Sequence, residues 1–248
     1  MKRLAGALFL VALASPAAAE RLTIALSLAQ VEIASNFSGA PMTVFGVIAA
    51  DKGAQPAGDY QVAVMVLGPT ESLVERRKDR MVGIWMNHAA MTIAGAPSYY
   101  ALQASEQPDA IAKPDVLNRL QIGLDRLAIG LDEGDPASGE FRSAYIRLKE
   151  KAGLYSEQTA VRFLGPLIFR TGTFLPANTP VGRYTVIAYL FSGGNLVAHA
   201  QDYFVVTKSG LEGSIAHFAR SQSLAYGILC AVLALFIGWA GGVIFRRD

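Results

Sequence analysis

Hydrophobic and polar residues alternate with a period of two in several stretches, which is typical of half-buried β-strands. The clearest case places Val62, Val64 and Val66 at every second position between two turn signals. Alternating or apolar runs predict further strands at residues 22–27, 31–35, 42–50, 73–87 (a pair of strands), 90–93, 165–174, 181–190 and 196–206. The pattern therefore predicts a mainly β domain over residues 20–210.

The period changes near residue 114, where apolar residues recur at every third or fourth position, as on one face of a helix. The first run comprises Leu117, Leu120, Leu124, Leu127 and Leu131. A second run comprises Phe141, Tyr145, Leu148 and Ala152, and Gly153 supplies a stop signal. We expect a hairpin of two antiparallel helices, inserted at about residues 105–158 between the strands.

A short motif of the form G-x-Y-x-V occurs twice, at residues 58–62 and 182–186. In immunoglobulin-like sandwiches a tyrosine at the start of a strand often ties a turn to the sheet through its hydroxyl. Tyr60 and Tyr184 are the candidates for this role. Together with the strand pattern, the motif predicts one immunoglobulin-like β-sandwich with an inserted helical hairpin.

The N-terminal residues 1–19 have the pattern of a secretory signal peptide. Lys2 and Arg3 precede an apolar stretch at residues 4–14, and three alanines end the segment. We expect cleavage after Ala19, so that the mature chain begins at Glu20. An uncleaved anchor helix is the alternative.

Near the other end, residues 223–245 form a run of 23 residues without a charge. As a helix this run would extend for roughly 34 Å, enough to cross a hydrocarbon core of about 30 Å. Arg246 and Arg247 follow at once and are expected to remain in the cytoplasm. The sequence thus predicts one transmembrane helix, preceded by a juxtamembrane helix at residues 211–222 and followed by a cytoplasmic tail at 246–248.

Small residues recur at every fourth position on one stripe of this predicted span: Cys230, Ala234, Gly238 and Gly242. Such stripes, and the GxxxG pair in particular, let membrane helices approach closely. Self-association or docking on a membrane partner is one interpretation. Because small residues are common in membrane helices, a chance pattern is the other.

The charge balance disfavours a nucleic-acid-binding protein, and the cysteine content excludes a domain held together by internal disulfides. Removing Lys2 and Arg3 leaves 20 basic and 20 acidic residues, so the mature chain has no basic field for nucleic acid. Cys230 is the only cysteine and lies in the predicted span, so the exported domain forms no internal disulfide. We expect no cofactor.

Motifs for catalysis are absent from the sequence. His88, His199 and His217 lack a second histidine or cysteine at metal-ligand spacing. The G-x-S-x-G, G-x-G-x-x-G and P-loop patterns do not occur. A membrane-anchored hydrolase built from distant residues is a remaining alternative, which a substrate screen would test.

Residues 81–91 carry the most suggestive side chains. Met86 and His88 are weak candidates for a periplasmic copper(I) site, because thioether and imidazole groups bind copper(I). Trp85 and Asn87 are candidates for an interaction surface. For all four residues, an ordinary role in the core or on the surface is the alternative. The mixed-charge run at residues 71–80, which precedes them, fits either a solvated edge strand or an edge that docks on a partner.

Several short motifs carry a resemblance to a known family: residues 37–39, 44–46, 66–69, 83–87, 175–184, 208–212 and 226–227. They extend over nearly the whole chain. The chain resembles an alphaproteobacterial family of single-pass transmembrane proteins without an assigned activity. The resemblance implies a bacterial inner-membrane protein with a periplasmic domain, and it supplies no catalytic residues.

These observations favour a non-catalytic, membrane-anchored periplasmic accessory protein that contacts the lipid bilayer and associates with an inner-membrane complex, a transporter or itself. A periplasmic copper or small-ligand binding protein is the alternative, and a hydrolase the second alternative.

Overall fold

The computed structural model describes residues 20–49, 59–81, 83–132, 134–209, 215 and 218–244, a few of them by their backbone alone. The predicted signal peptide, the cytoplasmic tail, His217 and half of the juxtamembrane segment 211–222 lie outside the described residues.

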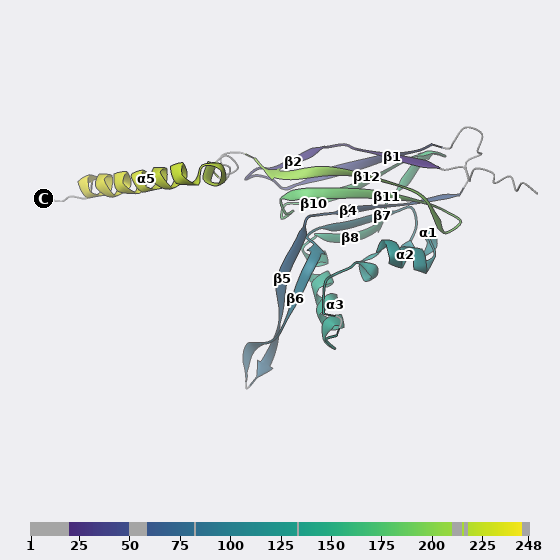
Figure 1. The fold of residues 1–248 in the computed structure, drawn as a ribbon, viewed down its shortest axis with the longest axis horizontal. Coiled ribbons are helices and arrows are strands. Elements are labelled where there is room, and N and C mark those ends of the chain that lie inside the picture. Colours follow the sequence, from purple (N-terminus) through teal and green to yellow (C-terminus); the bar gives the residue numbers. More distant parts are fainter. Residues whose placement is uncertain are drawn as a thin grey trace, which may run out of the picture.

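The mainly β architecture is confirmed, and it consists of two stacked sheets (Figure 1). The smaller sheet has the strand order β1 (Arg21–Leu26), β3 (Gly39–Ala49), β10 (Ile168–Pro176), β9 (Arg162–Gly165). The larger sheet has the order β2 (Gln30–Ile33), β12 (Asn195–Lys208), β11 (Gly182–Ser192), β4 (Tyr60–Leu67), β7 (Tyr100–Ala104), β8 (Tyr155–Thr159). Neighbouring strands are antiparallel except for β2 with β12 and β7 with β8.

The core lies between the two sheets. Alternate residues of β10 are buried, as expected for a strand with one face on the core and one on solvent. Phe169 on β10 is completely buried, and Gly46 on β3 makes this possible, because a Cβ at Gly46 would lie 2.0 Å from the Phe169 ring. Burial of such aromatic side chains stabilises the sandwich by a few kcal/mol each.

The hydroxyl of Tyr184, at the start of β11, donates a hydrogen bond of 2.7 Å to the carbonyl of Pro180. The predicted tie between a strand and its preceding turn is therefore present at Tyr184. Tyr60, in the other G-x-Y-x-V motif, donates at 2.6 Å to Glu20 at the start of the described chain instead.

The helical insertion lies between β7 and β8 and differs from the predicted pair of helices. It contains α1 (Pro108–Ile111), α2 (Pro114–Leu120), the 3-10 turn η1 (Leu124–Arg126) and α3 (Ser138–Lys151). The first predicted helix is shorter than expected, because Gln121 (φ 55°) and Gly123 (φ 111°) turn the chain out of the helical conformation. Leu117 and Leu127 are nevertheless buried, so the leucine stripe faces the core without being one helix.

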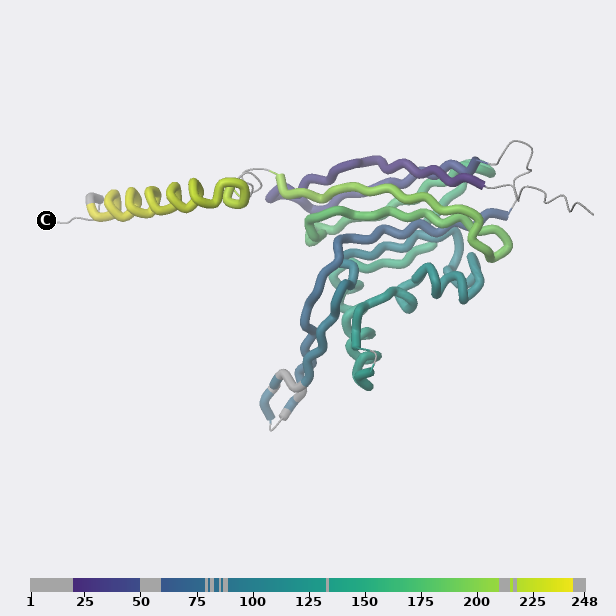
Figure 2. Tube along the Cα trace, in the orientation of Figure 1, coloured from purple at the N-terminus to yellow at the C-terminus, as the bar shows by residue number. Residues whose placement is uncertain are grey.

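A long hairpin projects from one end of the sandwich (Figures 1 and 2). It consists of β5 (Thr70–Met81) and β6 (Ile84–Pro97), and β6 merges two strands that the sequence pattern had separated. Figure 1 shows α3 lying alongside the hairpin. Hairpin and α3 together form an arm, and we use this name below for residues 70–97 with 138–151.

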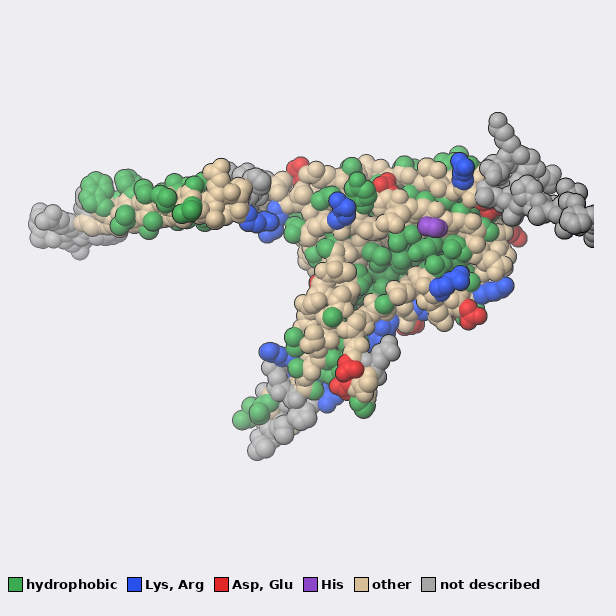
Figure 3. Space-filling model, viewed as in Figure 1, with side chains coloured by type: hydrophobic (Ala, Val, Ile, Leu, Met, Phe, Trp, Pro, Cys, Tyr) green, Lys and Arg blue, Asp and Glu red, His purple; other side chains and the backbone are tan. Residues whose placement is uncertain are grey.

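The last element, α5 (Ser223–Ile244), extends away from the sandwich (Figure 1) and carries hydrophobic side chains along its surface (Figure 3). Residues Ser223–Gly242 have a mean hydropathy of 2.1, and none of this stretch is buried against the domain. The helix is long and apolar enough to cross a membrane, as predicted.

Candidate functional site

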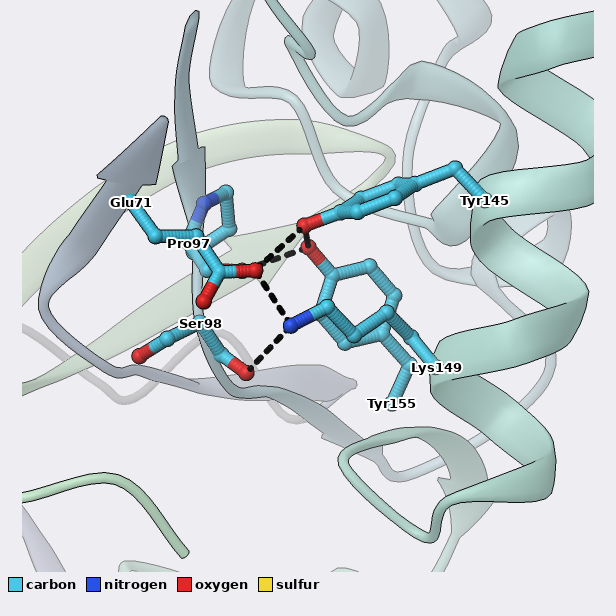
Figure 4. Close-up of polar contacts among 6 residues, drawn as sticks. All are labelled: Glu71, Pro97, Ser98, Tyr145, Lys149 and Tyr155. Atoms are coloured by element: carbon cyan, nitrogen blue, oxygen red, sulfur yellow. Dashed lines mark hydrogen bonds and ion pairs between the residues drawn. The ribbon is translucent and has the colours of Figure 1, made fainter. Parts of the chain in front are cut away.

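Four side chains and two backbone carbonyls fasten the arm to the sandwich where the hairpin begins (Figure 4). The Lys149 ammonium on α3 forms an ion pair with the Glu71 carboxylate on β5. It also donates a 3.4 Å hydrogen bond to the Ser98 carbonyl. The Tyr145 hydroxyl donates to Glu71 at 3.1 Å. We call this cluster, with Tyr155, the arm lock.

Tyr155 on β8 extends the arm lock to the larger sheet. Its hydroxyl donates a 2.6 Å hydrogen bond to the Pro97 carbonyl, at the end of β6, and lies 3.4 Å from the Tyr145 hydroxyl. Burial raises the pKa of Tyr155 to about 12 and raises the pKa of Tyr145 further. Both phenols therefore stay protonated at neutral pH and act as hydrogen-bond donors, which suits a structural joint.

Farther along the arm, charged residues of β5 face residues of opposite charge on α3. Arg77 on β5 forms a 2.8 Å ion pair with Glu140 on α3. Between this pair and the arm lock, Glu75 faces Arg147. The two elements leave a groove of about 710 Å³, and its floor is partly apolar through Phe141.

Glu75 is the least satisfied group of this groove. Its Oε2 atom is buried and finds no hydrogen-bond donor within the described part of the chain. Desolvation raises the pKa of Glu75, and the nearby Arg147 guanidinium lowers it in part. A partner that offers a donor to this carboxylate would gain a hydrogen bond that the free protein lacks.

A second hollow of about 530 Å³ lies between β8 and β10, at the open side of the sandwich. Gln103 on β7 lines it, is 1% exposed, and has no partner for its Oε1 atom among the described residues. The neighbouring hollow of about 230 Å³ contains Thr171, whose buried Oγ1 also has no such partner. Two buried acceptors in adjoining hollows favour a ligand or water that donates hydrogen bonds.

The structure places the predicted site residues near the far end of the hairpin, away from the arm lock. Met86 is 52% exposed and pairs with Asp79. The register shifts between Arg77 and Lys78, so that β6 has one extra residue, His88, at a bulge. Strict alternation is lost across this bulge, so their spacing of two residues does not place Met86 and His88 on the same face of β6.

The backbones of Trp85 and Asn87 pair with Arg80 and Lys78. Their side chains, like that of His88, lie outside the described part of the structure. His199 lies on β12 beside Tyr189, at a ring separation of 6.4 Å. In the described residues no three His, Cys, Asp or Glu side chains gather to hold a metal ion. The copper site stays an untested prediction.

Cys230, Ala234, Gly238 and Gly242 all lie in α5, as predicted. Cys230 is exposed, and a Cβ at either glycine would meet open space. Their role in helix packing stays a prediction.

Sequence reasoning missed the arm lock. Tyr145 and Lys149 stand four positions apart on one helix, a spacing that places them side by side. Their partner Glu71 is 78 positions from Lys149, and no local pattern signals that pairing.

The fold and the apolar helix together define a membrane-anchored β-sandwich protein, with one candidate span within the described residues. Its sequence matches, over residues 21–247, the family described as "Putative transmembrane protein (Alph_Pro_TM)". The chain belongs to this family of alphaproteobacterial transmembrane proteins, which confirms the resemblance seen in its motifs. No curated protein matches the chain.

Proposed function

We propose that this protein is a non-catalytic accessory protein of the bacterial inner membrane, with its sandwich in the periplasm and its C-terminus in the cytoplasm. In this proposal the arm binds a membrane-protein partner. The observation that carries it is the arm lock: a partly buried ion pair and two phenols hold a projecting element in one orientation. Rigid presentation of a groove lowers the entropic cost of binding a partner.

The sandwich itself supports an immunoglobulin-like assignment. The order β1-β3-β10-β9 corresponds to the A-B-E-D sheet of such domains, and β12-β11-β4 corresponds to G-F-C. Tyr184 has the hydrogen bond of a tyrosine corner. Domains of this class commonly serve as scaffolds for recognition, and the hairpin between β4 and β7 would be the recognition insert here.

Photo-crosslinking in intact cells tests the partner. A photoreactive residue at Ser143, which lines the groove, is compared with one at Lys151, which is also exposed on α3 but does not line it. The proposal expects one discrete adduct with a membrane protein at Ser143, none at Lys151, and loss of the adduct in Glu75→Lys. Equal adducts at both positions, or none, would contradict the proposal.

A second candidate is the binding of a small polar ligand in the hollow between β8 and β10. The buried, unpartnered Oε1 of Gln103 favours it. Native mass spectrometry of the gently purified full chain would show a retained small molecule in the wild type and its loss in Gln103→Leu. An identical mass for ligand-free and purified protein would remove this candidate.

A further inference from the structure

The hairpin leaves the sandwich at the same end as the chain that leads to α5. Leu67, the last residue of β4, pairs with Thr185 on β11, and Gly182 at the start of β11 pairs with Val206 on β12. β12 ends at Lys208, and α5 begins at Ser223. Figure 1 likewise shows the hairpin and α5 departing from one end. A bilayer crossed by α5 would therefore lie close to the hairpin.

The face of β5 that points away from α3 carries three basic residues. Arg77 contacts Glu140 on α3, and strand alternation then directs the side chains of Arg76, Lys78 and Arg80 to the other face of β5. All three are exposed. Arg76 and Lys78 also border the groove between β5 and α3. The β5 residues at these alternate positions are Val74, Arg76, Lys78 and Arg80, and their backbones pair with those of Thr92, Ala90, Asn87 and Trp85. None of these eight residues is Asp or Glu.

The far end of the same hairpin exposes apolar side chains. Ile84 is 65% exposed and Met86 is 52% exposed, and Figure 3 shows hydrophobic side chains gathered there. An exposed apolar end is costly in water. It becomes favourable at the boundary between headgroups and acyl chains, where basic residues meet anionic lipid.

We propose that the hairpin lies on the bilayer that α5 spans, with anionic phospholipid headgroups against Arg76, Lys78 and Arg80 and with Ile84 and Met86 in the interfacial layer. A strand of 12 residues extends for about 40 Å, so the contact would be long. This inference rests on the membrane anchoring of α5 in the proposed function. It leaves the opposite face of β5, with the groove, open to a partner.

Because Cys230 in α5 is the only cysteine of the chain, a thiol-reactive label can be attached at one chosen position. The full-length protein is placed in nanodiscs of phosphatidylcholine, with or without phosphatidylglycerol. One sample carries an environment-sensitive fluorophore on Cys230. A second carries it on Ile84→Cys in a Cys230→Ser background, and Met86→Cys serves as a second hairpin position.

We expect lipid-borne quenchers to reach the label at position 84 in discs with phosphatidylglycerol. A label at Asp59→Cys, at the opposite end of the sandwich beside Tyr60, should stay unquenched. Replacing Arg76, Lys78 and Arg80 by Gln should shift the bound-to-free ratio by roughly two orders of magnitude, since each basic residue near an anionic surface contributes roughly fivefold.

Two results would overturn the inference. A label at 84 that stays in water in both kinds of disc shows that the hairpin does not touch lipid. A label that is shielded from water but not quenched by lipid shows contact with protein, such as a second copy. In both cases a quenched label on Cys230 would show that anchoring by α5 stands, whereas an unquenched one would refute the anchoring as well.

Discussion

The ammonium of Lys149 and the carboxylate of Glu71 form an ion pair across 78 positions of the sequence, and this pair joins α3 to the start of strand β5. Their side chains are 13% and 29% exposed, so the pair is partly desolvated. In such surroundings the loss of one partner costs more than the loss of a surface ion pair, because the other charge is left without compensation.

Replacing Lys149 by Met should therefore lower the free energy of unfolding by about 2 kcal/mol and loosen the arm. Glu71 would keep only the hydrogen bond from Tyr145. Denaturant titration followed by circular dichroism measures the first effect, and hydrogen exchange in residues 70–97 the second. Lys151→Met, at the exposed end of α3, is the control; equal losses in both variants would show that the arm lock is not the cause.

Removal of the Tyr184 hydroxyl should destabilise the sandwich. Tyr184→Phe leaves the Pro180 carbonyl without its 2.7 Å donor, at a cost of about 1–2 kcal/mol. Tyr203→Phe, on the exposed side of β12, should change stability by less than about 0.5 kcal/mol. The midpoints of chemical denaturation of the two variants give the comparison. Unchanged stability in Tyr184→Phe would show that the hydrogen bond to Pro180 does not stabilise the sandwich.

Gly46 should tolerate no side chain. A methyl group there would lie 2.0 Å from the buried Phe169 ring, so Gly46→Ala must displace an aromatic side chain from the core. Overpacking of this kind costs about 3 kcal/mol. Gly165→Ala is the matched control, because nothing lies within 4 Å of its added Cβ. Thermal unfolding should separate the two clearly, and equal melting temperatures would be the contrary outcome.

The Glu75 carboxyl should make the stability of the folded protein depend on pH. Its pKa is raised by desolvation, so the folded chain binds this proton more tightly than the unfolded chain does. Stability should therefore fall as pH rises from the ordinary glutamate pKa through the raised one, and the penalty persists above it. Glu75→Gln should be more stable than wild type at pH 7, with the difference vanishing in acid. Unfolding curves across that pH range check the sign, and a Gln variant that is less stable at neutral pH would contradict it.

Local patterns predicted most of the strands, the helix α5 and the hydrogen bond of Tyr184, because each depends on residues close in sequence. They missed the short strands β7, β8 and β9. The length of the first predicted helix was wrong in detail, since Gln121 and Gly123 interrupt it while the leucines still reach the core. A periodic stripe reports which residues are buried, and an irregular chain can bury them as well.

The candidate site could be predicted only in part. The hairpin residues Trp85 to Asn87 were noticed, but the arm lock depends on strand pairing and helix packing between distant segments. The bulge at His88 shows the same limit, because a period-two pattern cannot count an extra residue that only the partner strand reveals. Gly46 lies within one of the family motifs, and its contact with Phe169 supplies a physical reason for a glycine there.

The most direct test concerns the orientation of α5. Alkaline phosphatase, which is active only in the periplasm, and green fluorescent protein, which becomes fluorescent only in the cytoplasm, are each fused after Asp248 of the full chain. Because Arg246 and Arg247 should remain in the cytoplasm, the account predicts an inactive phosphatase fusion and a fluorescent second fusion. An active phosphatase with a dark fluorescent fusion would contradict it.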